Sequence, residues 1–335
     1  MTDTLFLSSE DVAELATPAE YVDAVREGYR QRGEGAPAEP RTALYNEEPP
    51  GLFTSYTAVL PETGVMGGYV YGAGFGAGDA WFVTPLFDAD SGEPLALLDG
   101  ASMNPFKTGA AGAVGVAVHA LARPDASTMA VIGAGAQARG QLRAAATVRD
   151  LETVWVYSPT KESREEFAGE MDRALDASVA AVSSSDAAVE GADVVVTATS
   201  ASAPVFDGNR LDPGTHVTAM GQYHPEKREL DDTTVARSTY VIDLQGRLTQ
   251  DAGSYMGAVE SGAVEADHCH GELGSVVAGE QPGRPDEEAI TVFDSGGTGI
   301  ETVAAAAMLY EKAIEADLGE TISFAPASEA LTGRE

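Results

Sequence analysis

Cysteine, basic residues and long apolar runs are all scarce in this sequence. A single thiol, Cys269, cannot form an intrachain disulfide, so the chain carries no sign of an oxidising compartment. No apolar run is long enough to span a membrane, and residues 1–10 lack the basic start and apolar core of a signal peptide. These absences predict a cytoplasmic protein.

Acidic residues outnumber basic ones by 53 to 20, which gives a formal net charge of −33 at pH 7. Such a chain repels nucleic acids and anionic membranes, and no segment concentrates lysine or arginine, so neither is expected as a partner. The charge also exceeds what solubility requires at ordinary ionic strength. In concentrated salt the Debye length falls to about 3 Å, and carboxylate repulsion is screened. The composition therefore predicts a protein from a halophile.

The chain has 335 residues, of which 44% are hydrophobic, so it can form two domains with cores of their own. Apolar residues at helical spacing near the start predict one or two opening helices within 9–29. Short aromatic and β-branched segments separated by Gly, Pro and Asp then predict a mostly antiparallel sheet. Its strands are expected at 52–59, 69–71 and 81–87. The small residues of 107–122 predict a tightly packed helix.

From Arg123 onward, short apolar runs alternate with helical or turn segments, which is typical of a doubly wound parallel sheet. The runs are Met129–Ile132, Val154–Tyr157, Val179–Val182, Val194–Ala198, Val217–Met220 and Tyr240–Asp243. A long alanine-rich helix follows from Gly299, and nothing strand-like of comparable length comes after it. We therefore expect an α/β fold with a Rossmann-type dinucleotide-binding domain at 123–299. The segments 1–122 and 300–335 are expected to form a discontinuous α+β domain for substrate binding and dimerisation.

A glycine-rich fingerprint marks the start of the predicted Rossmann domain. Gly133, Gly135 and Ala138 follow an apolar strand and open a helix that is expected to run to about Arg149, in the pattern G-x-G-x-x-A. The first glycine permits a tight turn, the second lets backbone amides approach a diphosphate, and the helix N-terminus supplies partial positive charge. The alternative is a glycine-rich turn with no ligand. The strand before it and the helix after it favour the dinucleotide site.

The choice of cofactor depends on the end of the second strand, where an acidic residue would bind the 2′-hydroxyl of NAD. No acid stands there in this chain. Ser158 and Thr160 can donate hydrogen bonds to a 2′-phosphate, and Lys161 with Arg164 can neutralise it. The alternative is that both cations are simply solvated. The pattern predicts NADP(H), with NAD(H) as the second choice.

Several segments together resemble the ornithine cyclodeaminase/mu-crystallin family. They are Asp90–Gly100, Lys107–Ala111, Ile132–Gln137, Lys227–Asp231, Glu272–Gly274 and Ile290–Gly297. Members of the family act on small α-amino or α-imino acids by hydride transfer at the C–N carbon, as cyclodeaminases, alanine dehydrogenases or ketimine reductases. The resemblance implies a homodimer whose N-terminal domain, completed by the C-terminal helix, supplies the dimer interface and much of the substrate pocket. The segment 157–162 is similar to the NADPH-binding segment of the ketimine reductases.

The resemblance also assigns site residues. It implies that Arg41 binds the substrate carboxylate, and it places Tyr69 and Gly296 at the substrate. Tyr69 stands where the family has a lysine, Lys107 where it has an arginine, and Tyr223 where some members have an acid-base aspartate. The implied cofactor contacts are Lys107, Thr108, Gly133, Gly135, Ala136, Gln137, Ser158, Thr160, Lys161, Arg164, Thr199, Met220, Gly221, Lys227 and Ser295.

These departures bear on the reaction. Cyclodeamination needs a group that shuttles protons, whereas a tyrosine with a pKa near 10 donates a proton but is a poor base at neutral pH. His224 is an alternative acid-base residue. With Lys107 as a further catalytic candidate, we predict an NAD(P)-dependent oxidoreductase that reduces a small imino acid or oxidises an amino acid. The alternatives are an ornithine cyclodeaminase and a non-catalytic NADP(H)-binding protein.

The run His268–Cys269–His270 could suggest a metal site. Its two histidines are expected on one face, but the sequence offers no second Cys/His cluster, so we expect no metal there. His119 is expected to be a packed helix residue.

Overall fold

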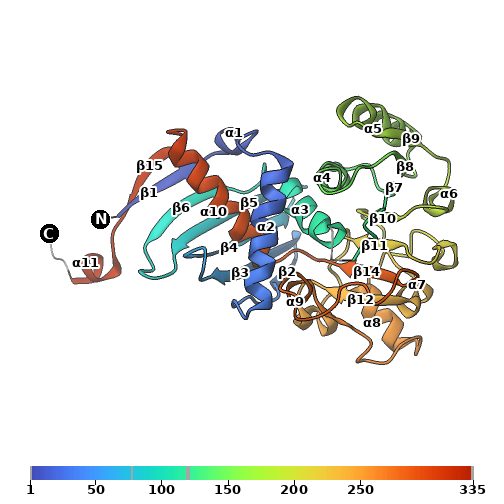
Figure 1. Cartoon of the computed structure of the whole chain (residues 1–335). Helices are drawn as coiled ribbons and strands as arrows, with labels where there is room; N and C mark the ends of the chain where they lie inside the picture. The colour runs from blue at the N-terminus through green and yellow to red at the C-terminus, as the bar shows by residue number, and fades with distance from the viewer. Residues whose placement is uncertain (1, 77, 118–120, 333–335) are drawn as a thin grey trace. The chain divides into compact units, whose positions relative to one another are not determined.

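The computed structural model describes residues 2–76, 78–117 and 121–332 (Figure 1). The chain divides into two compact units. Unit 1 comprises Met1–Asn104 and Thr298–Glu335, and unit 2 comprises Pro105–Gly297. The N-terminal unit is thus discontinuous in sequence. The boundary between the units follows Asn104, so the small-residue helix that was expected in the first domain belongs to unit 2. His119 lies outside the described residues.

Unit 1 is built on a seven-stranded sheet in the order β15-β1-β6-β5-β4-β3-β2. The strands are β1 (Thr2–Leu7), β2 (Thr42–Glu47), β3 (Pro50–Leu60), β4 (Val65–Gly74), β5 (Asp79–Asp88), β6 (Pro94–Asp99) and β15 (Glu320–Phe324). The expected antiparallel sheet is confirmed for β2 to β6. Strands β1 and β15 were not predicted, because β15 is short and mostly exposed and forms only by pairing with β1.

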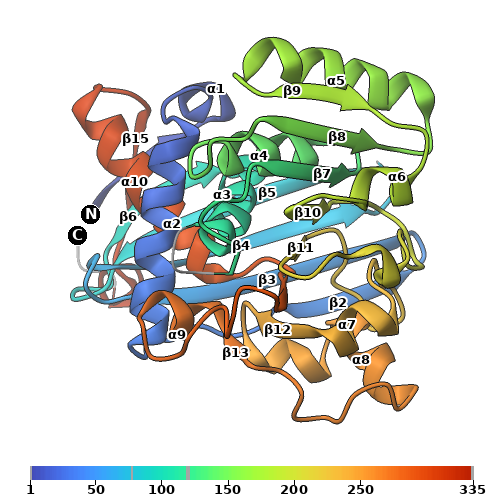
Figure 2. The ribbon, with the colours of Figure 1, turned by 45° about the vertical axis from the view of Figure 1, so that its right-hand side comes forward.

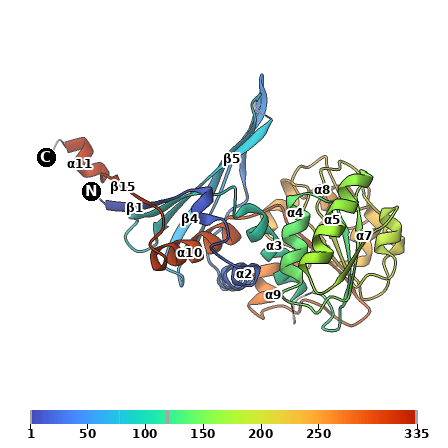
Figure 3. The same ribbon diagram turned by 90° about the horizontal axis from the view of Figure 1, so that it is seen from above.

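Two long helices belong to unit 1, α2 (Pro18–Gly33) and α10 (Gly299–Glu315), with the short α1 (Ser9–Val12) before them and α11 (Ala327–Thr332) after them. Thr17 and Glu20 form a capping box at the start of α2. Gly28 lets α2 approach α10 closely, since a Cβ there would lie 3.0 Å from the Cβ of Ala304. Figure 3 shows both helices on the same side of the sheet, where α10 packs on β3, β4 and β5.

Unit 2 contains an eight-stranded, wholly parallel sheet in the order β13-β12-β14-β11-β10-β7-β8-β9 (Figure 2). Its strands are β7 (Thr128–Ile132), β8 (Thr153–Tyr157), β9 (Ser178–Ala181), β10 (Val194–Thr197), β11 (His216–Ala219), β12 (Ser238–Ile242), β13 (Gly271–Glu272) and β14 (Ile290–Asp294). All six predicted strands are present. β14 was not counted among them, although it lies in the sheet between β11 and β12.

The helices of unit 2 include α3, which covers Asn104–Val116 and not the whole of 107–122. The other helices are α4 (Ala136–Ala145), α5 (Lys161–Ala174), α6 (Ser185–Val189), α7 (Asp232–Arg237), α8 (Gly253–Glu260) and α9 (Leu273–Val277), with short 3-10 turns η1 (Gly208–Arg210) and η2 (Gln245–Thr249). α3 belongs with unit 2 because a Cβ at Gly109 would collide with the backbone of Gly140 on α4, and Gln141 donates a hydrogen bond to the Thr108 carbonyl over 2.8 Å. None of the helices within the described residues is long and apolar enough to cross a membrane.

Candidate functional site

The two fingerprint glycines in the turn between β7 and α4 are needed for different physical reasons. Gly133 has φ +124°, and a Cβ on it would collide with the carbonyl of Ala198. The position therefore requires glycine for backbone reasons. Gly135 has φ −87°, and a Cβ on it would meet no atom within 4 Å. Gly135 leaves open space above the N-terminus of α4, where backbone amides can receive an anion.

A cavity of about 630 Å³ lies beside this turn. It is lined by Ile132, Gly133, Ala134, Gly135, Tyr157, Ser158, Pro159, Ser185, Ala198, Thr199, Ser200, Ala201 and Val205. Most of these residues lie at or just after the carboxyl ends of β7, β8 and β10, which are neighbours in the sheet. Because the chain leaves β7 toward β8 on one side and places β10 on the other, this is the switch point at which open parallel sheets bind ligands.

The predicted 2′-phosphate residues are only partly brought together. Arg164 donates a hydrogen bond to the Ser158 carbonyl over 2.8 Å, and its guanidinium lies 5.8 Å from the centre of the Tyr157 ring. Because Ser158 lines the cavity, the Arg164 side chain that bonds to its carbonyl lies near the cavity. Thr160 is exposed at the N-cap of α5, and Lys161 is exposed and pairs with Glu165 at 3.6 Å.

Helix α3 carries Lys107 and Thr108 in its first turns, and both are buried. The Lys107 ammonium lies 3.5 Å from the Thr108 hydroxyl. A buried ammonium near a helix N-terminus opposes the helix dipole, which favours an anion as its neighbour. On α4, Ala136 and Gln137 follow the glycine turn, and the Gln137 Oε1 is buried with no hydrogen-bond partner within the described residues.

The loop after β14 holds Ser295 and Gly296. The Ser295 hydroxyl and the Gly296 amide both donate to Oδ2 of Asp243, over 2.8 and 2.9 Å. Asp243 is held in turn by the buried Arg247, which also pairs with Asp251 and Asp294. Burial raises the pKa of Asp294, with Arg247 opposing that shift. This charged cluster fixes the loop rather than facing solvent.

The loop after β11 places the candidate proton donors at the surface. Tyr223 is 37% exposed, and His224 accepts a hydrogen bond from the Glu226 amide at Nδ1 over 3.1 Å. Lys227 is exposed, whereas Met220 is buried at the end of β11. Gly221 donates its amide to Glu229, a buried carboxylate that the sequence analysis did not assign.

In unit 1, Arg41 lies among aromatic side chains and is 6% exposed. Its Nη1 donates to the Tyr71 hydroxyl over 3.2 Å, and its guanidinium lies 5.3 Å from the centre of the Tyr56 ring. A guanidinium beside a ring in this way is favoured by cation–π attraction. Tyr56 and Tyr71 were not predicted. Each is buried between less buried neighbours on its strand, a pattern that indicates a buried sheet face but not a contact with Arg41.

The sequence profile of the ornithine cyclodeaminase/mu-crystallin family matches residues 2–317. The chain belongs to this family. A Delta(1)-pyrroline-2-carboxylate reductase from Bacillus cereus is 37% identical over 243 residues, which make up 72% of this chain and 74% of that protein. The predicted family is thus confirmed.

Two solved structures of the family cover almost the whole chain. The Delta(1)-pyrroline-2-carboxylate reductase of Thermococcus litoralis, in complex with NADH and L-proline, is 31% identical, with a TM-score of 0.89, and the match covers 95% of this chain and 100% of that chain. An archaeal alanine dehydrogenase dimer with bound NAD is 30% identical, with a TM-score of 0.88, over 97% of this chain and 100% of that chain. They confirm the predicted α/β fold with its Rossmann-type sheet.

Tyr69, which the resemblance places where the family has a lysine, is a neutral buried residue. Its hydroxyl donates to the Gly100 carbonyl over 3.1 Å, and its ring stacks on Phe82 with centroids 5.0 Å apart. Burial raises the pKa of Tyr69 well above its ordinary value. The position therefore presents an aromatic surface rather than a cation.

The two histidines of 268–270 bind different backbone carbonyls. His268 Nε2 lies 2.9 Å from the Val235 carbonyl, and His270 Nε2 lies 2.8 Å from the Pro282 carbonyl. Across the residues that the structure describes, no group of three or more metal-ligating side chains is found.

Proposed function

We propose that this chain is an NADP(H)-preferring reductase of a small α-imino acid. The coarse part of this statement, an NAD(P)-dependent oxidoreductase acting at a C–N carbon, is confirmed by the family relatives, which are named as pyrroline-2-carboxylate reductases and an alanine dehydrogenase. The preference for NADP(H), the direction of reaction and the roles of individual residues are our proposal.

The open space at Gly135 is the observation that carries the cofactor site. The turn leaves room where a side chain would otherwise stand, beside a cavity at the sheet's switch point and a helix N-terminus. The buried Gln137 Oε1 adds a polar group near this turn that has no partner within the described residues. Gly133, Gly135 and Ala136 are suited to a diphosphate, and Ser158 with Arg164 to a 2′-phosphate.

Arg41 is assigned to the substrate carboxylate because its planar guanidinium matches two oxygens. Lys107 supplies positive charge for a carboxylate or for the diphosphate. When bound, the reduced nicotinamide supplies a hydride to the imine carbon. Tyr223 or His224 donates the proton that the nitrogen requires, and a donor suffices for reduction.

A turnover assay tests the function. The protein is incubated with NADPH or NADH and a panel of cyclic and linear imino acids, including pyrroline-2-carboxylate, and loss of the reduced nicotinamide's absorbance is followed. Oxidation of NADPH by an imino acid is expected. Conversion of ornithine to proline without net cofactor consumption would show a cyclodeaminase instead, and tight binding with no oxidation on any compound would show a binding protein.

The substitution Gly135→Ala tests the cofactor site separately. Because the added methyl group meets no atom, the fold is expected to keep its melting temperature, while the affinity for NADPH falls at least roughly tenfold. Gly169→Ala on α5 is the control, since its Cβ would lie 3.5 Å from one flexible arginine atom and Gly169 does not line the cavity. Unchanged NADPH binding by Gly135→Ala would place the diphosphate elsewhere.

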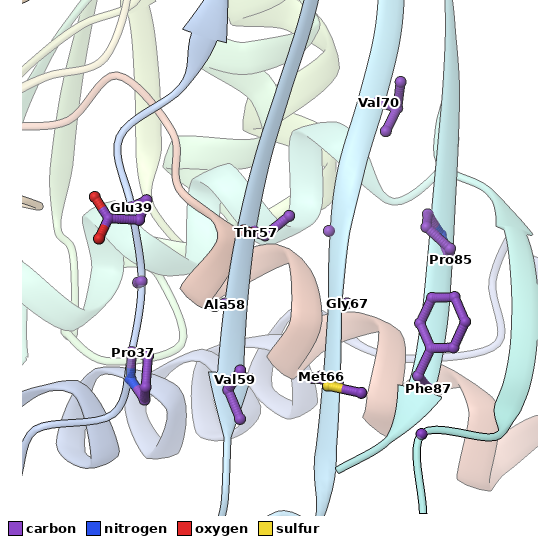
Figure 4. Close-up of a pocket in the computed structure, with 13 residues that line it drawn as sticks. Pro37, Glu39, Thr57, Ala58, Val59, Met66, Gly67, Val70, Pro85 and Phe87 are labelled. Carbon is purple, nitrogen blue, oxygen red and sulfur yellow. The ribbon is translucent and has the colours of Figure 1, made fainter.

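We further propose that unit 1 forms a homodimer through the face of its sheet that α10 leaves uncovered. Leu44, Phe53 and Trp81 lie in one cross-strand row and are 63%, 49% and 64% exposed. The same sheet carries an apolar pocket of about 500 Å³, with Val59 and Phe87 among its lining residues. Figure 4 shows these residues on strands that lie in front of a helix, with the pocket on the side away from that helix. Apolar surface of this extent favours a protein partner. Light scattering measures the oligomeric state of the parent protein and of the double variant Trp81→Glu with Phe53→Glu. A monomeric parent protein, or a double variant that stays dimeric, would contradict this assignment.

A further inference from the structure

Glu229 is a buried carboxylate that the proposed chemistry does not use. It is 1% exposed, on the segment between β11 and α7. Its two oxygens accept four hydrogen bonds. The donors are the Thr199 amide (2.8 Å) and hydroxyl (2.6 Å) at Oε1, and the Thr197 hydroxyl (2.9 Å) and Gly221 amide (2.8 Å) at Oε2.

These donors come from two neighbouring parallel strands. Thr197 ends β10 and Thr199 follows it, while Gly221 follows β11. The backbone at Gly221 also comes close to the carboxylate, since a Cβ there would lie 2.5 Å from Glu229 Oε1. A single side chain thus connects the loops at the carboxyl ends of β10 and β11.

The position of these loops indicates which part of a dinucleotide they serve. In a doubly wound sheet the diphosphate sits at the end of the first strand, here β7, and the adenosine ribose at the end of the second, here β8. β10 lies on the other side of β7, followed by β11. The nicotinamide half therefore extends over the loops that Glu229 holds together.

We propose that Glu229 is a positioning residue for the nicotinamide half of the cofactor, acting through Thr199 and Gly221. This inference rests on the proposed dinucleotide function. Two backbone amides and two hydroxyls converge on the carboxylate, and each of its oxygens accepts a backbone amide from a different loop.

The proposed role requires both acceptor oxygens of a carboxylate, and a side chain of the same size and shape is not sufficient. A glutamine has the same size but only one acceptor oxygen, and its amide nitrogen would face either the Thr199 amide or the Gly221 amide. Neither backbone N–H can act as an acceptor, so one loop loses its anchor. Burial raises the pKa of Glu229, and the hydrogen bonds from Thr199, Gly221 and Thr197 lower it. The four hydrogen bonds stabilise the charged form and so oppose the effect of burial on the pKa of Glu229.

The test compares Glu229→Gln with Asp193→Asn by calorimetry, using NADH as the probe for the whole cofactor and 5′-AMP for the adenosine half. Asp193 is a matched control because its carboxylate also accepts from two backbone amides and a threonine hydroxyl, at Ser127 and Thr128, but at the amino ends of β7 and β10. For Glu229→Gln we expect NADH affinity to fall roughly ten- to hundredfold with 5′-AMP affinity unchanged. Asp193→Asn is expected to bind both probes as the parent does.

Three results would overturn the inference. One is parental NADH affinity in Glu229→Gln, another is an equal loss for NADH and 5′-AMP, and the third is the same selective loss in Asp193→Asn. If Glu229→Gln does not fold, Thr197→Val decides, because it removes one donor at Oε2 while keeping the carboxylate. NADH affinity must then fall severalfold, and parental affinity would refute the role. If the parent protein binds neither NADH nor NADPH, the proposed function itself is rejected.

Discussion

Arg41, which directly precedes β2, donates a hydrogen bond to the hydroxyl of Tyr71 on β4 over 3.2 Å. Tyr71 is 7% exposed on a sheet face that also carries Tyr56 and Tyr69. The aromatic rings restrict the side-chain rotamers of Arg41, so the guanidinium is already ordered for the substrate role that we propose for it.

The substitution Arg41→Lys tests this arrangement. Lysine keeps the charge but loses the planar fork, so we expect kcat/KM for an imino acid to fall roughly ten- to hundredfold, mostly through KM, with NADPH affinity unchanged. Steady-state kinetics and cofactor titration measure the two effects. Arg30→Lys on α2, whose partners are Glu27, Glu34 and Glu62, is the control. Parental KM in Arg41→Lys would remove Arg41 from the substrate site.

The double substitution Lys161→Ala with Arg164→Ala tests the preference for NADP(H). Removing two cations near Ser158 is expected to weaken NADPH binding at least roughly tenfold and to leave NADH binding unchanged, because only NADPH carries the 2′-phosphate. Titrations with both cofactors measure the ratio. Arg173→Ala, in the last turn of α5, should change neither affinity. If the parent protein already prefers NADH, the NADP(H) assignment is wrong.

His216 makes the stability of unit 2 depend on pH. Burial lowers its pKa from 6.5 to about 3, and its ring nitrogens lie 2.9 Å from the hydroxyls of Thr291 and Thr218. The unfolded chain therefore takes up a proton below pH 6.5 that the folded protein refuses until about pH 3, so stability falls as pH decreases through this window.

Urea unfolding at pH 6.5 and at lower pH values checks this expectation. Well below the unfolded pKa, the loss attributable to one histidine approaches about 1.4 kcal/mol per pH unit. His216→Gln is less stable at neutral pH but should show a smaller decline between pH 6.5 and 5, where most carboxylates stay ionised. An equal decline in both proteins would contradict the role of His216.

The net charge of −33 predicts a dependence on salt. Added KCl screens repulsion among the carboxylates, so the melting temperature is expected to rise through the molar range and the fold to weaken in dilute buffer. Calorimetric scans at graded KCl concentrations measure the effect. A protein that keeps its fold and activity indefinitely in dilute buffer would overturn the assignment to a halophile.

The glycine fingerprint and six strands of unit 2 could be predicted because their causes are local. An apolar run such as Met129–Ile132 forms a buried parallel strand in many contexts, and Gly133 meets a backbone requirement of the turn that follows. The antiparallel strands β3, β4 and β5 were equally visible in their aromatic, β-branched segments.

The amino-acid sequence by itself determined the family, the Rossmann-type sheet and the position of the glycine-rich turn after β7. Only the tertiary structure placed β14 between β11 and β12, paired β15 with β1, assigned α3 to unit 2, surrounded Arg41 with tyrosines and connected two loops through Glu229. The physical reason is distance along the chain. Strand order, helix packing and buried polar contacts depend on partners far away in sequence, whereas turns and apolar runs depend on neighbours within a few residues.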